Sequence, residues 1–251
     1  MGSGAGSGVT EHTPDQSEAS HDTNRNIAVG LPDALGRPLL RTPRRMASSR
    51  ATQAARQTER TGKDRMTQLP WRADPLVWGH GPRVFEVFLE PTCPFSVRAF
   101  GKLDDLLAQA GEDRITIKIR LQSQPWHMYS GVIVRCILAA STLAGGKEAA
   151  KSVMAAVAAH REEFEFERHC RGPNLDATPN DIIARIEGYS GVNLADAFAI
   201  PDLDREIKSH CKYARQNGIH VSPTFMIDGL VQADMRSGDA IADWASRLLR
   251  Y

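Results

Sequence analysis

The stretch from Val84 to Phe100 places an apolar run, a cysteine–proline pair and a helical pattern in immediate succession. The apolar run ends at Leu89 and predicts a buried strand. Cys93 and Pro94 follow shortly after it, and the helical pattern begins at once. Proline is tolerated at the first position of a helix, because its missing N–H group would have no partner there. The sequence therefore predicts a strand that delivers a thiol to the start of a helix.

The predicted position of Cys93 gives its thiol a chemical role. With Pro94 as the first helical residue, Cys93 is the N-cap, and the free N–H groups of Phe95 and Ser96 are expected to point toward its sulfur. The positive end of the helix dipole lies there too, and cysteines in such settings reach pKa values of roughly 3.5 to 7.5, against about 8.5 for a free cysteine. Cys93 is therefore the candidate nucleophile. The alternative is a small buried apolar residue that happens to precede a proline.

A second motif lies far along the chain, where Val221–Phe225 reads Val-Ser-Pro-Thr-Phe ahead of another apolar run. Together, the strand followed by Cys-Pro-aromatic-x and this later motif resemble the thioredoxin fold in its DsbA-like form, from about Arg83 to the C terminus. The resemblance implies a cis Ser222–Pro223 bond that lies against the sulfur of Cys93. It also implies that backbone groups beside this proline pair with a bound peptide or glutathione, as an added strand would. The alternative for Pro223 is an ordinary strand-edge proline.

Ser96 departs from the pattern of this family. Its redox members carry Cys-x-x-Cys, whereas this chain has Ser96 at the position of the second, resolving cysteine. An internal disulfide cannot form at such a site, although the Ser96 hydroxyl can donate a hydrogen bond to the Cys93 thiolate. Phe95 stands where strongly oxidising members have histidine, so the resemblance implies that the Cys93 thiol is less acidic than theirs.

The candidate site residues come from both motifs and from the segment that follows a predicted strand at Arg114–Leu121. Trp126 and His127 follow that strand and are expected to border the Cys93 cleft, although core packing would explain the tryptophan equally well. The predicted catalytic residues are Cys93, Ser96 and Pro223, and the predicted substrate-binding residues are Pro94, Phe95, Ser222, Thr224 and Trp126.

The remaining cysteines predict neither a metal site nor a disulfide framework. Cys136 and Cys211 fall among apolar residues at helical spacing and are expected to lie in the core. The pairs His169–Cys170 and His210–Cys211 lack the separations of a zinc site. No metal and no bound cofactor are therefore predicted. With four cysteines in 251 residues, the chain fits a reducing compartment better than a secreted one.

Charge and hydropathy argue against a nucleic-acid-binding protein and against a membrane-spanning protein. Residues 1–65 carry 10 Lys/Arg and 7 Asp/Glu, whereas residues 66–251 carry 21 and 23, so the second part is mildly acidic. No basic surface rich in aromatic residues is indicated, and nucleic acid is not an expected partner. No apolar stretch reaches the roughly 18 residues that suggest a membrane span. The sequence shows no secretory signal, and we expect a cytoplasmic protein.

The chain divides into a tail and one domain. Residues 1–65 lack apolar periodicity and predict a disordered tail, and residues 70–251 predict an α/β, thioredoxin-like domain with a helical insertion at about 127–200, as in DsbA-like proteins. Asp228-Gly229 is a signal for a two-residue hairpin. The other strands are expected at Arg114–Leu121, Pro223–Asp228 and Leu230–Ala233. The helix that begins at Pro94 has Phe100, Leu103, Leu107 and Ala110 on one face and stops at Gly111. The other helices are expected at Tyr129–Ala144, Lys147–Phe166, Pro179–Gly188, around Leu194, Leu203–Asn217 and Asp239–Leu249.

Three functions are compatible with this pattern, because a fold does not fix an activity. The first is a monothiol thiol–disulfide oxidoreductase, in which Cys93 attacks a disulfide-containing or glutathionylated protein and an external thiol such as glutathione resolves the product. The second is a glutathione transferase or isomerase like the kappa class, whose Ser-Pro-Tyr-Ser segment resembles Cys93–Ser96. The third is a non-catalytic binding domain that kept the fold. Glutathione is thus the expected co-substrate.

Overall fold

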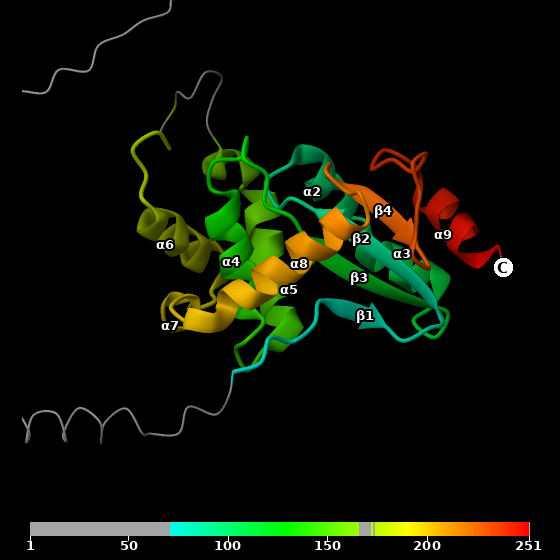
Figure 1. Ribbon diagram of the computed structural model, residues 1–251, viewed down its shortest axis with the longest axis horizontal. Coiled ribbons are helices and arrows are strands. Elements are labelled where there is room, and N and C mark those ends of the chain that lie inside the picture. Colours follow the sequence, from blue (N-terminus) through cyan, green and yellow to red (C-terminus); the bar gives the residue numbers. More distant parts are fainter. Residues whose placement is uncertain (1–70, 166–171, 173, 251) are drawn as a thin grey trace, which may run out of the picture. The chain divides into compact units, whose positions relative to one another are not determined.

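The computed structural model describes residues 71–165, 172 and 174–250 (Figure 1). Every described residue belongs to one unit of the chain, Arg65–Tyr251. The predicted disordered tail and the His169–Cys170 pair lie outside the described residues.

A mixed sheet of five strands in the order β1-β3-β2-β4-β5 forms the centre of the described unit. The strands are β1 (Val77–Gly79), β2 (Arg83–Leu89), β3 (Ile115–Leu121), β4 (Thr224–Ile227) and β5 (Leu230–Val231). β2 pairs with β3 in parallel, and the other neighbouring strands are antiparallel. β2 therefore lies in the middle of the sheet, and its last residue, Leu89, precedes the Cys93 segment.

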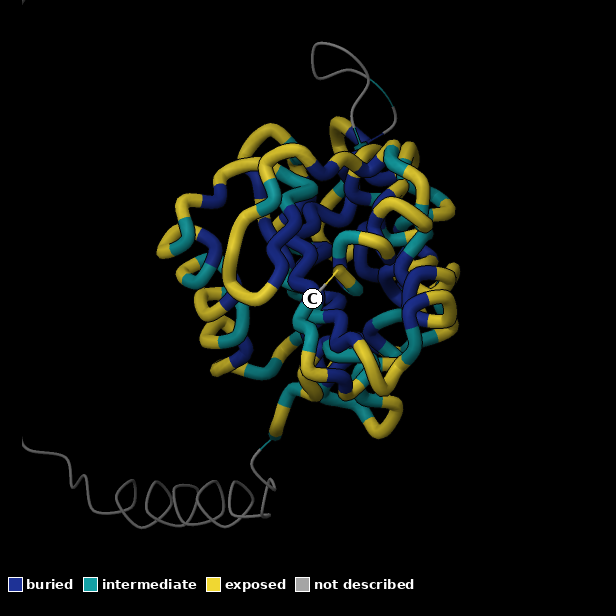
Figure 2. Tube along the Cα trace, turned by 90° about the vertical axis from the view of Figure 1, so that its right-hand side faces the viewer, coloured by how far each residue is buried: buried dark blue, intermediate teal, exposed yellow. Residues whose placement is uncertain are grey.

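The helices cover both faces of the sheet. They are α2 (Pro94–Phe100), α3 (Leu103–Ala110), α4 (Ser130–Ala140), α5 (Gly146–Ala159), α6 (Pro179–Ser190), α7 (Ala195–Phe198), α8 (Asp204–Gln216) and α9 (Ile241–Leu249), with short 3-10 helices η1 (Arg161–Phe164) and η2 (Pro201–Leu203). The segment from α4 to α7 follows β3 and forms the helical insertion. Figure 2 shows the buried segments enclosed by exposed turns.

Successive residues of β2 point to opposite faces of the sheet, as strand geometry requires. Phe85 and its alternate neighbours belong to the main core, where Phe85 packs against Phe225 and against Trp244 of α9. Phe88 belongs to a smaller cluster with Ala214 of α8. The sheet is thus a middle layer, which explains why the β2 sequence is apolar on both faces.

Most of the predicted elements are confirmed, but the predicted helix Lys147–Phe166 is too long, because α5 ends at Ala159 and the separate 3-10 helix η1 follows. The single helix predicted from Pro94 to Ala110 is wrong, because α2 ends at Phe100 and α3 begins only at Leu103. Lys102 lies in this break, and its ammonium group donates to the carbonyl groups of Ser237 and Asp239 at 2.6 and 2.7 Å.

Two further differences concern short elements. The sequence pattern missed β1, since its three residues are half-buried and show no alternation. The predicted hairpin at Asp228-Gly229 is confirmed, with φ values of 46° and 83°. Such positive angles suit a tight two-residue turn and favour glycine at the second position.

A polar cluster lies between the sheet and α8. Glu86 of β2 is 4% exposed and pairs with Arg120 of β3 at 2.7 Å, and the Tyr213 hydroxyl donates to the same carboxylate at 2.8 Å. Nearby, Nδ1 of His210 accepts the backbone N–H of Leu121 at 2.9 Å. These contacts join α8 to the sheet through polar groups that would be costly to bury alone.

The buried imidazole of His210 predicts a pH dependence of stability. Burial, assisted by the positive charge of Arg120, lowers the pKa of His210 from 6.5 to about 4. The unfolded chain therefore binds more protons between these values, and stability is lost as the pH falls from about 6.5 toward 4. The loss is expected to reach about 3 kcal/mol at 1.36 kcal/mol per pKa unit, measured by urea unfolding between pH 4 and 7.5.

His210→Asn is the matched test of this assignment, because its amide oxygen can accept the Leu121 N–H and does not titrate in this range. The variant should lose less stability on acidification than the parent does. His80→Asn, at an exposed position, should behave like the parent. A parallel acid response of the parent and His210→Asn would show that the acid sensitivity originates elsewhere.

Candidate active site

Cys93 occupies the predicted position at the start of α2. It is the N-cap residue, with extended φ and ψ values of −66° and 124°, and Pro94 opens the helix. The Cys93 carbonyl accepts the first helical hydrogen bond, from Val97 N–H at 2.9 Å, and the Cys93 N–H donates to the Glu90 carbonyl at 3.1 Å. The thiol is held between the end of β2 and the first turn of α2, with only 7% of the residue exposed.

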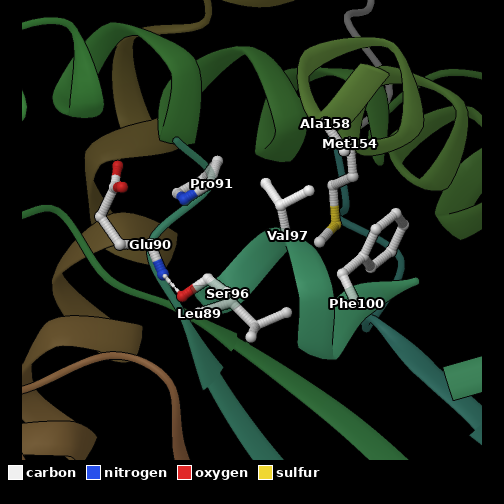
Figure 3. A pocket seen from close by; sticks show the side chains of 8 residues that line it. All are labelled: Leu89, Glu90, Pro91, Ser96, Val97, Phe100, Met154 and Ala158. Atoms are coloured by element: carbon white, nitrogen blue, oxygen red, sulfur yellow. Dashed lines mark hydrogen bonds between the residues drawn. The ribbon is translucent and has the colours of Figure 1, made fainter. Parts of the chain in front are cut away.

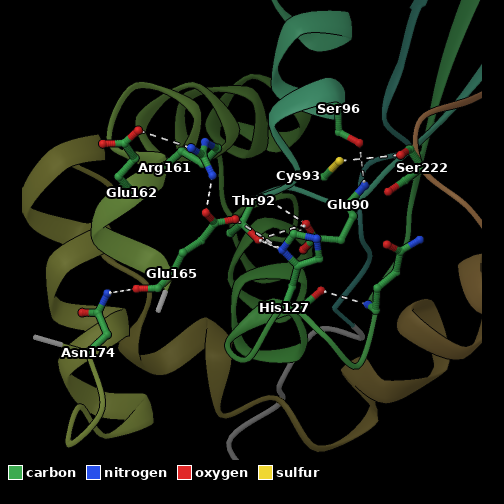
Figure 4. Close-up of polar contacts among 12 residues, drawn as sticks. Glu90, Thr92, Cys93, Ser96, His127, Arg161, Glu162, Glu165, Asn174 and Ser222 are labelled. Atoms are coloured by element: carbon green, nitrogen blue, oxygen red, sulfur yellow. Dashed lines mark hydrogen bonds and ion pairs between the residues drawn. The ribbon is translucent and has the colours of Figure 1, made fainter. Parts of the chain in front are cut away.

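The expected contact between the sulfur and the N–H groups of Phe95 and Ser96 is wrong, because the Cys93 side chain makes no capping hydrogen bond. Its Sγ lies 3.6 Å from the carbonyl oxygen of Ser222 instead, across 129 positions of sequence (Figure 4). The sulfur of a thiol is a weak hydrogen-bond acceptor, whereas its S–H group can donate to a carbonyl, so the contact with Ser222 suits the protonated Cys93 side chain. The Ser222–Pro223 bond is cis, and the two distant motifs meet at the sulfur.

Ser96 is turned toward the backbone of β2. Its residue is 1% exposed, and its hydroxyl accepts the backbone N–H of Glu90 at 3.3 Å. Within the described part of the chain, no hydrogen bond joins Ser96 to Cys93. The residue at the resolving position therefore links the first turn of α2 to the end of β2.

Several large apolar side chains are exposed close to the thiol. Phe95 is 55% exposed, Trp126 67%, Met128 58% and Val221 64%. Phe95 lies two residues after Cys93 on α2. Trp126 and Met128 flank His127, which contacts Thr92, and Val221 precedes Ser222, which contacts Cys93. The exposure of Trp126 rules out core packing as its explanation.

The remaining predicted binding residues lie in these same segments. Pro94 is exposed, and Ser222, Pro223 and Thr224 are half-buried. The Thr224 hydroxyl donates to the Val221 carbonyl at 2.7 Å and so closes the turn that carries the proline. The Thr224 hydroxyl therefore stabilises the turn that carries Pro223.

Cys136 and Cys211 differ in their surroundings. Cys136 is fully buried in the core as predicted, and burial raises the pKa of its thiol to about 12. The prediction of a core position for Cys211 is wrong, because it is half-buried and lines a surface cleft with Trp126 and His220. α8 packs on β3 and α4, and Cys211 lies beyond that contact. Among the described thiols, Cys211 is thus the most exposed, Cys93 is 7% exposed and Cys136 is fully buried.

A buried polar cluster behind Cys93 was not predicted from the sequence. Glu90 is 0% exposed, and its Oε2 accepts the Thr92 N–H at 3.0 Å and the Thr92 hydroxyl at 2.9 Å. Nδ1 of His127 lies 2.9 Å from the same hydroxyl. Figure 4 shows the three side chains converging beside the Cys93 segment. The segment that leads into Cys93 is thus held by the carboxylate of Glu90 and the imidazole of His127, both of which contact Thr92.

The helical insertion adds a second carboxylate to this cluster. Glu165, just after η1, places Oε1 3.3 Å from Nδ1 of His127 and also pairs with Arg161. Asn174 fixes this segment, since its amide nitrogen donates to the carbonyl groups of Glu163 and Glu165 at 2.8 and 2.7 Å. The insertion therefore contributes directly to the surroundings of the thiol.

The cavity beneath α2 is too small for a substrate. It has a volume of about 10 Å³ and is bounded by Leu89, Ser96, Val97, Phe100 and Met154, among others (Figure 3). This is room for about one water molecule, and Cys93 is not among the residues that bound the cavity.

The described residues include no helix that is both long and apolar enough to cross a membrane. They also contain no group of three or more His, Cys, Asp or Glu side chains arranged to hold a metal ion.

The fold and site together define a thioredoxin-like α/β protein with a thiol at a helix start. No family model and no curated protein matches the chain. A Pseudomonas syringae crystal structure, provisionally described as a protein-disulfide isomerase, is 76% identical and covers 70% of this chain and 98% of its own, with a TM-score of 0.69.

More distant structures share the fold alone. A protein-disulfide isomerase from Novosphingobium aromaticivorans is 15% identical over 71% of this chain and 100% of its own, with a TM-score of 0.53. The thiol–disulfide exchange protein alpha-DsbA2 from Wolbachia pipientis is 15% identical over 80% of this chain and 98% of its own, with a TM-score of 0.51. The chain belongs to the DsbA-like thioredoxin-fold family, which confirms the predicted fold class.

Proposed function

We propose that the protein is a monothiol thiol–disulfide oxidoreductase with Cys93 as its nucleophile. The observation that carries this proposal is the placement of the Cys93 sulfur at the start of α2, 3.6 Å from the Ser222 carbonyl. Its similarity to a protein described provisionally as a disulfide isomerase supports a disulfide substrate. Ser96 at the resolving position makes the mechanism monothiol.

The cycle needs two thiol–disulfide exchanges. The Cys93 thiol loses its proton, and the thiolate attacks one sulfur of a protein–glutathione or protein disulfide. A mixed disulfide forms on Cys93, and the displaced thiolate takes up a proton. The thiolate of reduced glutathione then attacks the other sulfur of the mixed disulfide, the one that belongs to the substrate. Cys93 leaves as a thiolate and takes up a proton, and the second product is released as a disulfide with glutathione. Ser96 takes no part in this exchange, because a hydroxyl cannot resolve the mixed disulfide.

The surroundings of Cys93 favour a peptide as the substrate. The exposed side chains of Phe95, Trp126, Met128 and Val221 offer apolar contacts, and apolar surface that remains exposed often marks a binding site. The backbone next to Pro223 is a candidate for pairing with an extended segment. Glutathione is proposed as the external thiol, and a reducing compartment, such as the cytoplasm, would supply it.

Incubation with oxidised glutathione, followed by intact-mass measurement, is expected to give one glutathione adduct. Peptide mapping should place the adduct on Cys93, and Cys93→Ser should abolish it. Cys211→Ser is the matched control, because Cys211 is the most exposed of the described thiols, and it should keep the adduct.

The other outcomes of this experiment select other functions. Tight non-covalent binding of glutathione without an adduct would favour a transferase of the kappa type. Neither an adduct nor binding would favour a non-catalytic domain. An adduct found on Cys211 alone would overturn the assignment of Cys93.

A further inference from the structure

The buried carboxylate of Glu90 has no role in the exchange described so far. Its Oε2 accepts the Thr92 N–H and hydroxyl, whereas its Oε1 has no hydrogen-bond partner among the described residues. Burying an ionised carboxylate costs several kcal/mol unless a nearby charge or proton compensates. Burial accordingly raises the pKa of Glu90, and the Ser130 hydroxyl and His127 oppose this effect. The buried Glu90 carboxylate therefore needs either a positive charge nearby or a proton of its own.

His127 supplies one or the other through two contacts: its Nδ1 lies 3.5 Å from Oε2 of Glu90, and it also contacts the hydroxyl of Thr92. Oε2 of Glu90, Oγ1 of Thr92 and Nδ1 of His127 form a chain with both separations at 2.9 Å. A threonine hydroxyl has one proton to donate. If it donates to an ionised Glu90, then Nδ1 of His127 must carry a proton and donate to Thr92. If Glu90 is protonated and donates to Thr92, the hydroxyl donates to a bare Nδ1.

The two arrangements have the same heavy-atom contacts and differ by the transfer of one proton from His127 to Glu90. Glu165, whose Oε1 is 3.3 Å from Nδ1, favours the arrangement with a proton on His127. Arg161 pairs with Glu165 and reduces this preference. The described titratable and charged groups at the cluster are therefore Glu90, Cys93, His127, Glu165 and Arg161, and α4 adds only the Ser130 hydroxyl.

We propose that Glu90 and His127, joined through Thr92, share one proton and act as positioning residues whose charge sets the reactivity of Cys93. The link to Cys93 is short, because Thr92 is its immediate neighbour and the Cys93 N–H donates to the backbone carbonyl of Glu90 at 3.1 Å. A negative Glu90 disfavours a thiolate at Cys93, and a positive His127 favours one. The inference rests on the proposed function only in taking Cys93 as the reactive thiol.

The test is the rate of alkylation of Cys93 by iodoacetamide between pH 5.5 and 9, followed by mass spectrometry of the Cys93 peptide. The parent rate should depart from the curve of a single ionisation, because the pair titrates beside the thiol. Glu90→Gln should react about three- to tenfold faster near neutral pH and His127→Asn slower by a similar factor, the size expected for one nearby charge. Each variant should approach the curve of a single ionisation.

Opposite shifts distinguish charge from structure, since simple loosening of the loop would move both variants in the same direction. Thr92→Val keeps the shape and removes the hydroxyl, so it should also lose the second inflection. Thr116→Val, a matched change at a buried threonine that donates to the Gly81 carbonyl, should keep the parent profile.

The outcome separates this inference from the proposed function. Labelling of Cys93 along a single-ionisation curve in the parent, or shifts of the same sign in both charge variants, would overturn the shared proton while leaving the proposed function intact. An unreactive Cys93 would overturn both. Should Glu90→Gln fail to fold, the parent profile and the half-buried His127→Asn variant still decide.

Discussion

Ser96→Cys is expected to reduce a protein disulfide in the absence of glutathione, whereas the parent should complete no such reduction under the same conditions. The new thiol would lie three positions after Cys93, on the first turn of α2, and could attack a mixed disulfide on Cys93 intramolecularly. Effective concentrations for well-oriented groups reach roughly 10⁵ M or more. The gain should therefore be large, measured as reduction of up to one protein disulfide per molecule of the prereduced variant, with an internal disulfide left in the variant.

The controls for Ser96→Cys follow from the contact of the Ser96 hydroxyl with Glu90 N–H. A thiol is a weaker acceptor, so the variant should be less stable by about 1 kcal/mol. Ser96→Ala reproduces that loss without a second thiol, and Cys93→Ser with Ser96→Cys removes the nucleophile. A folded Ser96→Cys protein that forms no internal disulfide and reduces no protein disulfide would contradict the proposed exchange chemistry.

Arg120→Met is expected to lower the free energy of unfolding by about 3 kcal/mol, because removing one partner of a buried ion pair leaves the other charge uncompensated. Glu86 is 4% exposed and would keep only the Tyr213 hydroxyl from its present partners. The stacking of Arg120 over the Tyr213 ring, at 4.5 Å, would also be lost. Urea unfolding at pH 7.5 measures the change.

A second substitution tests whether the uncompensated carboxylate causes this loss. Arg120→Met combined with Glu86→Leu should recover much of the stability, since apolar replacements of a buried pair are often neutral or better. Arg247→Met breaks the exposed pair with Asp234 and should have little effect. Equal losses in the single and the double Arg120 variants would show that packing of the arginine stem matters more than charge.

The sequence predicted most of the fold because its strongest signals are local. The apolar run of β2 and the alternation of β3 each identify an element from its own residues, and Gly229 marks its turn. The break between α2 and α3 was missed, because it depends on Lys102 reaching Ser237 and Asp239 far along the chain. β1 was missed because its partner strand stabilises it more than its own pattern does.

The site was predicted to the extent that its motifs are contiguous. Cys93 and Ser222 were paired through two short motifs and the resemblance they carry, but the orientation of the sulfur was wrong, because a tertiary carbonyl competes with the helix N–H groups. Glu90, His127 and Glu165 lie on three separate segments, and no spacing joins them. The available signal was an acidic residue, Glu90, between the end of the apolar run and the cysteine, and a carboxylate in a buried segment normally requires a partner.

Asn174 makes the helical insertion part of the chemistry as well as of the architecture. Its amide holds the carbonyl groups of Glu163 and Glu165, and Arg185 donates to its side-chain oxygen. A chimaera that joined this sheet and Cys93 loop to a different insertion would keep the thiol and Pro223 but lose the acid that faces His127. Exchange of insertions between relatives should therefore change the reactivity of the Cys93 thiol while the Cys-Pro motif stays the same.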